Sequence, residues 1–423
     1  TAPPVSVEPR PAAPAAQSLG WLRARILPNE LVPEPDPHRR GLILSYAPGT
    51  GPPGPIHRKS FVYDGALAAL AFSLAGDRVT ASRILQALVR VQRSDGSFWF
   101  SYSGDVSWPD EADHEMAIIR SGATAWVGYA LSFYLEGQPP PDSPRAERER
   151  DRFLATARRI ADFLLTLRVA DAPHARGLLR GGRGVVRLTV DPARKTVQEV
   201  YQDGPVRWIS TEQNISSFFF LASLHRVSGE PRYGAAAQEI RQRLLGSLWQ
   251  EDLGQFAQGF REDGRLDRTL ALDCASWGAL FLVAAGETDK AARALATADR
   301  LYQNRHGAVA GHRPYHDRPI YDDPRVQRVL MPAAPDARWR DLAIVWAEGS
   351  LGVALAHLRR GDVDRAREIV GEIAKMREGD GIRHATREVA YELSASPSVA
   401  GTAWHVIVEE ALRAPRARGV WAR

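Results

Sequence analysis

Four carboxylic acids stand in the first turns of apolar helical stretches that are widely separated along the chain. They are Asp64 in VYDGAL, Glu212 in STEQN, Asp273 in LDCASW and Glu348 in WAEGSL. An acid at this position is ordinarily a helix cap or a favourable partner of the helix dipole. If the helix starts converge, however, one acid can donate a proton while a second activates water. We therefore take these four acids as the candidate catalytic residues.

The stretches that contain the acids belong to a repeated helical hairpin. Six apolar stretches open with a small or acidic residue, and a second, amphipathic stretch usually follows. The openings lie at Tyr63, Ser121, Ser210, Leu272, Trp346 and Ser398. A helix that is apolar all round is buried, whereas a helix with one apolar stripe lies on a surface. The alternation predicts an all-α fold, an (α/α)6 toroid with an inner and an outer ring, and an open solenoid is the competing arrangement.

The same pattern predicts where the elements lie. Helices are expected at 63–75 and 79–92, 121–135 and 146–167, 210–227 and 231–248, 273–285 and 288–302, 341–359 and 363–376, and 398–412. Alternation on both sides of DPARK predicts a projecting β-hairpin over 184–201. Residues 1–58 are expected to form a Pro/Ala-rich, partly irregular extension with a short helix at 15–26, and residues 59–423 the catalytic toroid. Connections from outer to inner helices gather on one face, where repeat folds usually build a site.

The helix openings resemble the six-hairpin glycosidase-like superfamily. The segments concerned are FVYDGALAALAFSLAGD, QRSDGSFWFSY, WISTEQNISSFFFLA, LDCASWGALFL, WAEGSLGVALA and PSVAGTAWHV, within about residues 60 to 412. The resemblance implies a cleft at the N-terminal ends of the inner helices, sugar substrates, two carboxylic acids that perform the chemistry and, in many members, inversion of configuration. The superfamily also includes polysaccharide lyases and sugar epimerases, so the resemblance leaves the reaction open.

Glycosidic hydrolysis assigns different tasks to the two acids. One protonates the leaving oxygen and needs a raised pKa, and the other activates a water when the two lie about 6.5–9.5 Å apart. We predict Glu212 as the acid because it is flanked by aromatic and polar residues and reaches further than Asp, although Ser210–Gln213 also matches a capping box. Asp64 is the candidate base or hydroxyl partner. Asp273 and Glu348 remain candidates for either task.

Aromatic and polar side chains near the helix openings are the candidate substrate contacts. Sugar rings pack their C–H faces on aromatic rings, and their hydroxyls need planar polar partners. The predicted contacts are Tyr63, Trp99, Tyr102, Trp108, Arg207, Trp208, Gln213 and Asn214. Trp126, Trp277 and Trp404 stand further into apolar helices and are expected in the core. The acidic segment 110–115 could supply an additional acid, but such a run is more often a solvated loop.

The composition and the short motifs argue against several other kinds of site and partner. The net charge of +5 is small for 423 residues and the basic residues are scattered, so no nucleic-acid partner is expected. The single cysteine, Cys274, permits neither an internal disulfide nor a thiolate zinc site. HRPYHD at 312–317 lacks a third metal ligand, and RGGRG at 180–184 is not a phosphate loop, so no metal or cofactor is expected. No apolar run is long enough for a membrane span, and the N-terminal residues are typical of an exported protein, periplasmic or extracellular.

The leading prediction is a glycoside hydrolase that cleaves a polysaccharide or oligosaccharide by acid–base catalysis without a cofactor, with inversion. One alternative is a polysaccharide lyase that uses Tyr63, Tyr315 or His312 as its base. Another is a non-catalytic glycan-binding protein or scaffold in exopolysaccharide assembly, in which the four acids are only helix caps. An epimerase is disfavoured because paired histidines do not stand at the helix openings. The sequence leaves the sugar and the oligomeric state open.

Overall fold

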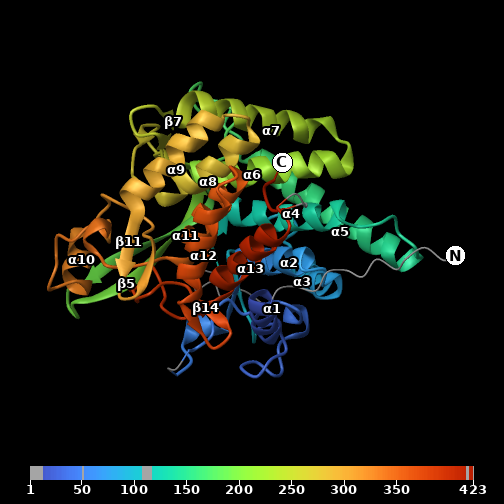
Figure 1. The fold of residues 1–423 in the computed structure, drawn as a ribbon, viewed down its shortest axis with the longest axis horizontal. Helices are drawn as coiled ribbons and strands as arrows, with labels where there is room; N and C mark the ends of the chain where they lie inside the picture. The colour runs from blue at the N-terminus through green and yellow to red at the C-terminus, as the bar shows by residue number, and fades with distance from the viewer. Residues whose placement is uncertain (1–12, 50–51, 107–116, 416–418, 423) are drawn as a thin grey trace.

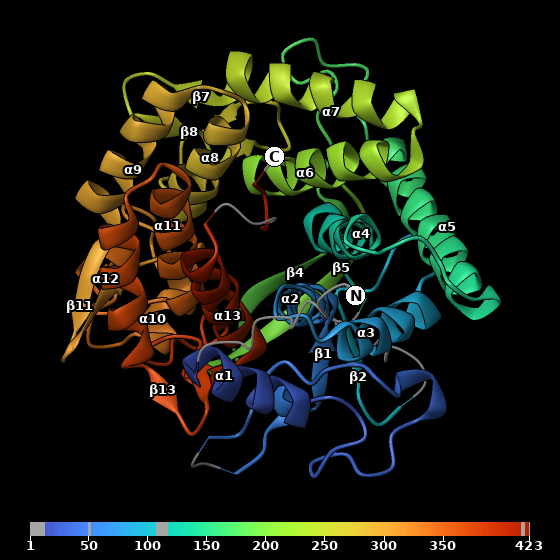
Figure 2. The same ribbon diagram turned by 45° about the vertical axis from the view of Figure 1, so that its right-hand side comes forward.

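The inner part of the molecule is a circle of helices. The computed structural model describes residues 13–49, 52–106, 117–415 and 419–422, and it is mainly helical with small sheets (Figure 1). The inner helices are α2 (Val62–Leu74), α4 (Ser121–Glu136), α6 (Thr211–Ser228), α8 (Leu272–Ala284), α11 (Ala347–Arg359) and α13 (Val399–Arg413). Each contacts the next, and α13 contacts α2, so the order is cyclic (Figure 2). This arrangement is compatible with the expected toroid.

A second set of helices lies outside the first. These are α3 (Arg78–Val91), α5 (Pro144–Thr166), α7 (Pro231–Arg243), α9 (Thr288–Tyr302) and α12 (Val363–Ala374), each packed on the inner helix that precedes it in the chain. Three of their N-termini follow local signals, since Asp77, Ser143 and Asp362 accept hydrogen bonds from backbone N–H groups of the first turn. Helix bounds match the predicted ranges closely, except at 341–359.

The N-terminal helix completes the outer layer. Helix α1 (Ala13–Ala24) packs against α13, and its Leu19 and Leu22 are buried in the main hydrophobic core. The sequence analysis placed this helix in a partly irregular extension, because the proline-rich flanks hide its tertiary contacts. From Ala13 onward this segment belongs to the same packed unit as the ring.

Aromatic side chains fill the centre of the ring. Trp421, near the C-terminus, stacks on Trp126 and on Phe219 with ring centroids 4.7 Å apart in each case. Trp277 and Trp404 complete the cluster, with centroids 6.2 Å apart. Large rings bury extensive apolar surface, and edge-to-face and offset contacts of this kind are favourable. The ring therefore has a packed centre rather than an open channel.

Short strands connect the helices. The pairs and triplets are β1 (Lys59–Phe61) with β2 (Ser101–Ser103); β3 (Ile119–Arg120) with β4 (Gly182–Asp191) and β5 (Thr196–Val206); β6 (Ile209–Ser210) with β9 (Gly259–Phe260) and β10 (Leu266–Asp267); β7 (Trp249–Gln250) with β8 (Gln255–Phe256); β11 (Gln303–His306) with β12 (Val309–His312); and β13 (Arg377–Glu378) with β14 (Gly381–Arg383) and β15 (Pro397–Ser398). The predicted hairpin over 184–201 is confirmed as β4–β5. Strands β1, β3, β6 and β15 lead directly into inner helices, so they fix where those helices begin.

A second hydrophobic cluster lies beside the main core. It contains Ile320, Tyr321, Trp339 and Val389, and side chains of β4 and β5 pack against it. Helix α10 (Pro324–Leu330) contacts the same hairpin and was not predicted, because its seven residues are too few to show a period.

The predicted helix at 341–359 begins later than expected. A short 3-10 turn over Trp339–Asp341 is followed by extended chain, and α11 begins at Ala347. The Val345 N–H donates to Thr386 Oγ1 at 2.9 Å, and Trp346 forms a bridge with Ala385. The apolar run LAIVW suits either a helix or a strand, and this long-range pairing decides between them.

Among the described residues, no helix has the length and apolar character needed to cross a membrane.

Candidate active site

The four candidate acids line one cavity. Asp64, Glu212, Asp273 and Glu348 come from the first turns of α2, α6, α8 and α11 and surround a volume of about 530 Å³. Asp64 is 5% exposed and Glu348 6% exposed. The cyclic order of the inner helices thus brings together side chains that are far apart in the sequence.

Burial raises the pKa of three of these acids toward or above neutrality. It raises the pKa of Asp64 to about 7, opposed by a hydrogen bond with Ser45, and that of Glu212 to about 7. Burial also raises the pKa of Glu348 to about 8; a hydrogen bond from Tyr63 opposes this shift, and the charges of Asp64 and Glu212 add to it. A carboxylic acid that keeps its proton near pH 7 can serve as a general acid.

Asp273 is the most crowded of the four. Burial, followed by the charges of Glu212 and Glu348, raises its pKa well above the ordinary value. Its Oδ1 atom is buried without a hydrogen-bond partner among the described residues. An ionised carboxylate in this position would be strongly unfavourable, so Asp273 is expected to stay protonated.

A chain of hydrogen bonds leads to Glu348 from the last inner helix. Trp404 Nε1 donates to Tyr63 Oη at 2.9 Å, and Tyr63 Oη donates to Glu348 Oε1. Burial and the neighbouring Glu348 raise the pKa of Tyr63 well above its usual value, so the phenol keeps its proton. Tyr63 therefore favours the ionised form of Glu348 and fixes the direction of its carboxyl group.

Two of the residues predicted as substrate contacts, Tyr63 and Gln213, also line the cavity. Ser121 Oγ donates to Gln213 Oε1 at 2.6 Å, which orients the amide between α4 and α6. Asn214, the next residue, is buried elsewhere, and its side chain pairs with both backbone polar groups of Leu179, at 2.8 and 3.0 Å. Asn214 is thus a structural residue, because successive side chains on a helix point in different directions.

The other predicted contacts that belong to the described residues lie outside the set of residues that line the cavity. Tyr102 is buried and donates to the Val91 carbonyl at 2.8 Å. The Trp99 ring is covered by the Arg93 guanidinium at 4.0 Å. Both residues stabilise the connection after α3. Their rings contact other parts of the protein rather than the substrate that the sequence analysis assigned to them.

Two of these predicted contacts, Arg207 and Trp208, lie in the connection before α6. Arg207 lines a small cavity beside Phe260, and the Trp208 ring packs against the Gly181 backbone, under the guanidinium of Arg120 at 5.5 Å. Trp108 and the acidic segment 110–115 lie outside the described residues.

The cavity wall contains residues that sequence reasoning missed. Trp126 and Trp277, expected in the core, reach the cavity as well. The remaining unpredicted lining residues come mainly from the segments before α2 and α13; they include Tyr46, Phe61, Phe100, Arg120, His384, Glu388, Tyr391, Glu392, Leu393 and Ser394. These segments have no periodic pattern, so no local signal marked them.

His384 is the one histidine among the described residues that line this cavity. Burial lowers its pKa to about 4, so the imidazole is neutral near pH 7. Its ring lies edge-on to Tyr46, with centroids 5.7 Å apart, and 6.5 Å from Trp346. A neutral imidazole has one ring nitrogen that can accept a hydrogen bond from a bound molecule.

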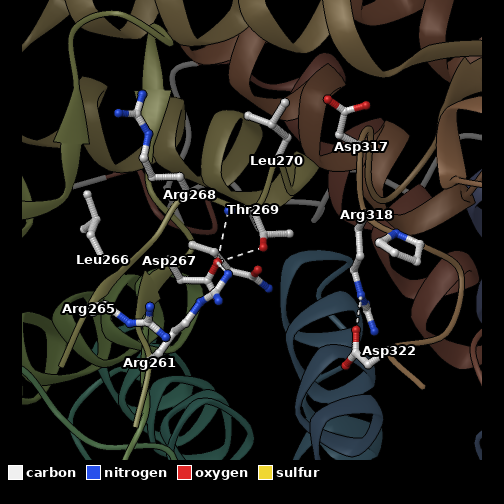
Figure 3. Close-up of a pocket in the computed structure, with 12 residues that line it drawn as sticks. Arg261, Arg265, Leu266, Asp267, Arg268, Thr269, Leu270, Asp317, Arg318 and Asp322 are labelled. Atoms are coloured by element: carbon white, nitrogen blue, oxygen red, sulfur yellow. Dashed lines mark hydrogen bonds and ion pairs between the residues drawn. The ribbon is translucent and has the colours of Figure 1, made fainter. Parts of the chain in front are cut away.

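A wider hollow of about 920 Å³ adjoins the site (Figure 3). It lies between residues 258–270 and 317–322, and charges within it are paired, as in Arg318 with Asp322 at 3.3 Å. Arg318 also approaches Glu392 of the first cavity at 3.8 Å, so the two hollows share a wall. No buried pair of acids is found among the described residues that line the wider hollow, and we do not assign catalysis to it.

His312, considered as a metal ligand in the sequence analysis, belongs to the outer layer. It lies 3.5 Å from Asp299, which also pairs with Arg365 at 3.1 Å. The Arg365 guanidinium therefore occupies the position beside Asp299 where a metal cation would have to bind. Among the described residues, no group of three or more His, Cys, Asp or Glu side chains is arranged to hold a metal ion.

Comparison with known proteins shows similarity in structure but not in sequence. No protein-family model matches the chain, and no curated protein does. One similar structure is a GH63 mannosylglycerate hydrolase from Thermus thermophilus in complex with glucose, with 14% identity, a TM-score of 0.57, and coverage of 96% of this chain and 100% of that one. Another is cellobiose 2-epimerase from Bacillus thermoamylovorans, with 9% identity, a TM-score of 0.60, and coverage of 94% and 98%.

A D-mannose isomerase is also similar, with 12% identity, a TM-score of 0.57, and coverage of 93% of this chain and 96% of that one. At such low identities the likeness concerns the fold alone. The chain is thus similar in fold to the six-hairpin glycosidase-like superfamily, as its helix openings predicted.

Proposed function

We propose that this protein is a glycoside hydrolase that cleaves a polysaccharide or oligosaccharide by acid–base catalysis on an (α/α)6 toroid. The observation that carries the proposal is a cavity with aromatic walls into which four acids with raised pKa values converge, two of which, Asp64 and Glu348, are buried. Structural caps of separate helices have no reason to share one buried space, whereas an acid–base pair must. Similarity in fold to a mannosylglycerate hydrolase agrees with this reaction class.

Glu212 is the proposed general acid. Burial holds its pKa at about 7, so a large fraction of the molecules keep a proton to donate at neutral pH. The proton passes from Glu212 to the glycosidic oxygen as the bond to the anomeric carbon breaks.

Glu348 is the proposed general base, because it is the acid that receives the Tyr63 hydrogen bond. The Tyr63 hydrogen bond opposes the upward shift that burial and the charges of Asp64 and Glu212 give the Glu348 pKa, so it stabilises the Glu348 carboxylate when it forms and fixes its direction. The Glu348 carboxylate then takes a proton from water as that water attacks the anomeric carbon. Attack from the face opposite the leaving group inverts the configuration.

Asp64 and Asp273 are proposed to bind sugar hydroxyls. A protonated carboxyl group both donates and accepts a hydrogen bond, which matches a hydroxyl. The unpartnered Oδ1 of Asp273 would gain a partner from the substrate. Phe61, Phe100 and Trp346 offer apolar surface for the ring faces.

Glu212→Gln and Glu348→Gln test the assignment. Each replaces a carboxyl group by an amide of the same shape, and we expect release of reducing sugar to fall by about 10²–10⁴-fold with glycan binding kept. Glu410→Gln is the matched control, since Glu410 is 5% exposed but pairs with Arg413 away from the cavity. Full activity in either cavity variant would refute the acid and base roles of Glu212 and Glu348.

A sugar isomerase or epimerase is the second candidate, favoured by neutral His384 in the cavity and by two of the similar structures. Such an enzyme moves a proton to and from a sugar carbon and releases no new reducing end. Incubating free aldoses with the protein and resolving the products by chromatography separates the two reactions. The lyase alternative is weakened because the Tyr63 phenol keeps its proton and cannot act as a base at neutral pH.

A further inference from the structure

An exposed aromatic side chain stands in the wall of the acid-lined cavity. Tyr391 lines that cavity and is 54% exposed. In the part of the chain that the structure describes, it is the one aromatic residue among the large exposed hydrophobics, the others being valines. A half-exposed ring contributes little to folding, so its position in a cavity wall requires another reason.

The backbone at Tyr391 is strained. Its φ is +64°, in the left-handed region that bulky residues rarely adopt. A non-glycine residue held in this region costs free energy, and such residues cluster at ligand sites. Glycine would remove the steric cost, yet the position holds a large ring.

The turn that presents Tyr391 is firmly held. Val389 and Leu393 exchange backbone hydrogen bonds of 2.8 and 2.9 Å, which close the turn around Tyr391. Tyr321 Oη donates to the Ala390 carbonyl at 2.8 Å, and Val389 is buried in the second hydrophobic cluster. The ring is therefore exposed on a rigid support, which lowers the entropy lost when a ligand packs on it.

We propose that Tyr391 is the platform of a sugar subsite beyond the cleaved bond, where the C–H face of a further sugar unit of an oligosaccharide packs on the phenol ring. The inference rests on the proposed function and specifies its substrate as longer than one sugar unit. Glu388 and Ser394 line the same wall and supply polar groups for the hydroxyls of that unit. The Ala395 N–H donates to Glu388 Oε2 at 2.7 Å, which fixes the carboxylate there.

Three variants separate a binding role from a structural one. Tyr391→Ala removes the ring and keeps the backbone strain, Tyr391→Gly removes both, and Tyr391→Phe keeps the ring. The probes are α- and β-linked trisaccharides of glucose and of mannose, together with the 4-nitrophenyl glycosides of the same sugars. Binding is measured by calorimetry, hydrolysis by kcat and KM, and folding by Tm.

We expect Tyr391→Ala and Tyr391→Gly to weaken trisaccharide binding and raise its KM by about three- to tenfold, as for loss of one aromatic contact. The KM for the 4-nitrophenyl glycoside, which lacks the further sugar unit, should change less than the KM for the trisaccharide. Tyr391→Phe should behave as the wild type, and Tyr391→Gly should keep or raise Tm. Equal effects on both substrates, unchanged trisaccharide binding, or a lower Tm in Tyr391→Gly would overturn the subsite.

The calorimetric arm distinguishes failure of the subsite from failure of the proposed function. If the wild type binds a trisaccharide without hydrolysing it, and Tyr391→Ala binds it several-fold more weakly, the subsite stands and the hydrolase assignment falls. If the wild type hydrolyses the trisaccharide and Tyr391→Ala does so with the same KM, the hydrolase stands and the subsite falls. A wild type that binds none of the trisaccharides refutes the subsite.

Discussion

Replacing Asp64 by Asn should make the protein more stable relative to the wild type at pH 8 than at pH 4. The native carboxyl group is 5% exposed and accepts a hydrogen bond from Ser45, and burial raises its pKa from 3.8 to about 7. In the unfolded chain the same group ionises near 3.8. The native state holds this proton more tightly than the unfolded state does. The stability that the Asp64 carboxyl group contributes is therefore complete below the pKa of the unfolded state, and it is lost as the pH rises through the pKa of the native state.

The magnitude follows from the shift. One pKa unit corresponds to about 1.4 kcal/mol, so the change from 3.8 to about 7 amounts to about 4 kcal/mol of stability that the wild type loses between acid and pH 8. An Asn side chain never ionises and can still accept from Ser45. Its removal of charge also relieves Glu348, whose pKa the Asp64 charge raises.

The assay is urea unfolding of both proteins at pH 4 and pH 8. We expect the free energy of unfolding of Asp64→Asn, relative to the wild type, to be higher at pH 8 than at pH 4 by up to about 4 kcal/mol. Asp77→Asn is a control without this pH dependence: hydrogen bonds from Thr80 and Arg23 lower the Asp77 pKa below 3.8, so its contribution is present above that pH, and the variant should lose nearly the same stability at pH 4 and at pH 8. A relative stability of Asp64→Asn that is the same at both pH values would mean that folding does not raise the Asp64 pKa.

Three further outcomes are expected. Tyr63→Phe removes the hydrogen-bond donor to Glu348 and so raises the Glu348 pKa. The acidic limb of the pH profile of kcat/KM should therefore shift to higher pH. An unshifted limb would show that Glu348 is not the base. Gly128→Ala places a Cβ 2.4 Å from the Phe220 ring and should cost about 1–3 kcal/mol in urea unfolding, whereas Gly371→Ala, with nothing within 4 Å, should not destabilise; equal effects would contradict the packing of α4 on α6. Trp421→Ala removes the ring stacked on Trp126 and Phe219 and should cost roughly 3–5 kcal/mol in the same assay, while a loss below about 1 kcal/mol would mean that this residue does not close the ring centre.

The helices and their order could be predicted because they depend on local patterns. An apolar stretch such as SWGALFLVAA in α8 and a one-sided stretch such as AARALATADRL in α9 are distinguishable by composition alone. The first-turn acids were found for the same reason, since a helix start has a signature and the repeat gives the starts a common face. Convergence of Asp64 and Glu348 then follows from the cyclic order of α2 and α11 with α13 between them.

The rest of the cavity depends on long-range contacts. His384 and Tyr391 lie in a segment without period, and Tyr391 is placed by a bridge between Val389 and Leu393 and by Tyr321. Asn214 was predicted as a substrate contact because it is a polar residue near a helix opening, but its amide pairs with the Leu179 backbone. Adjacent positions on a helix differ by about 100° in direction, so neighbourhood in sequence does not imply a shared cavity.

The most direct test is proton NMR of a panel of glycans. The panel is incubated in parallel with the wild type, Glu212→Gln and Glu348→Gln, and the products distinguish acid–base hydrolysis from every alternative at once. We expect the wild type to produce new reducing ends with inverted anomeric configuration and no unsaturated product that absorbs in the ultraviolet. Both variants should be nearly inactive while folded. Undiminished cleavage by either variant, or an unsaturated or isomerised product in place of hydrolysis, would contradict catalysis by the converging acids.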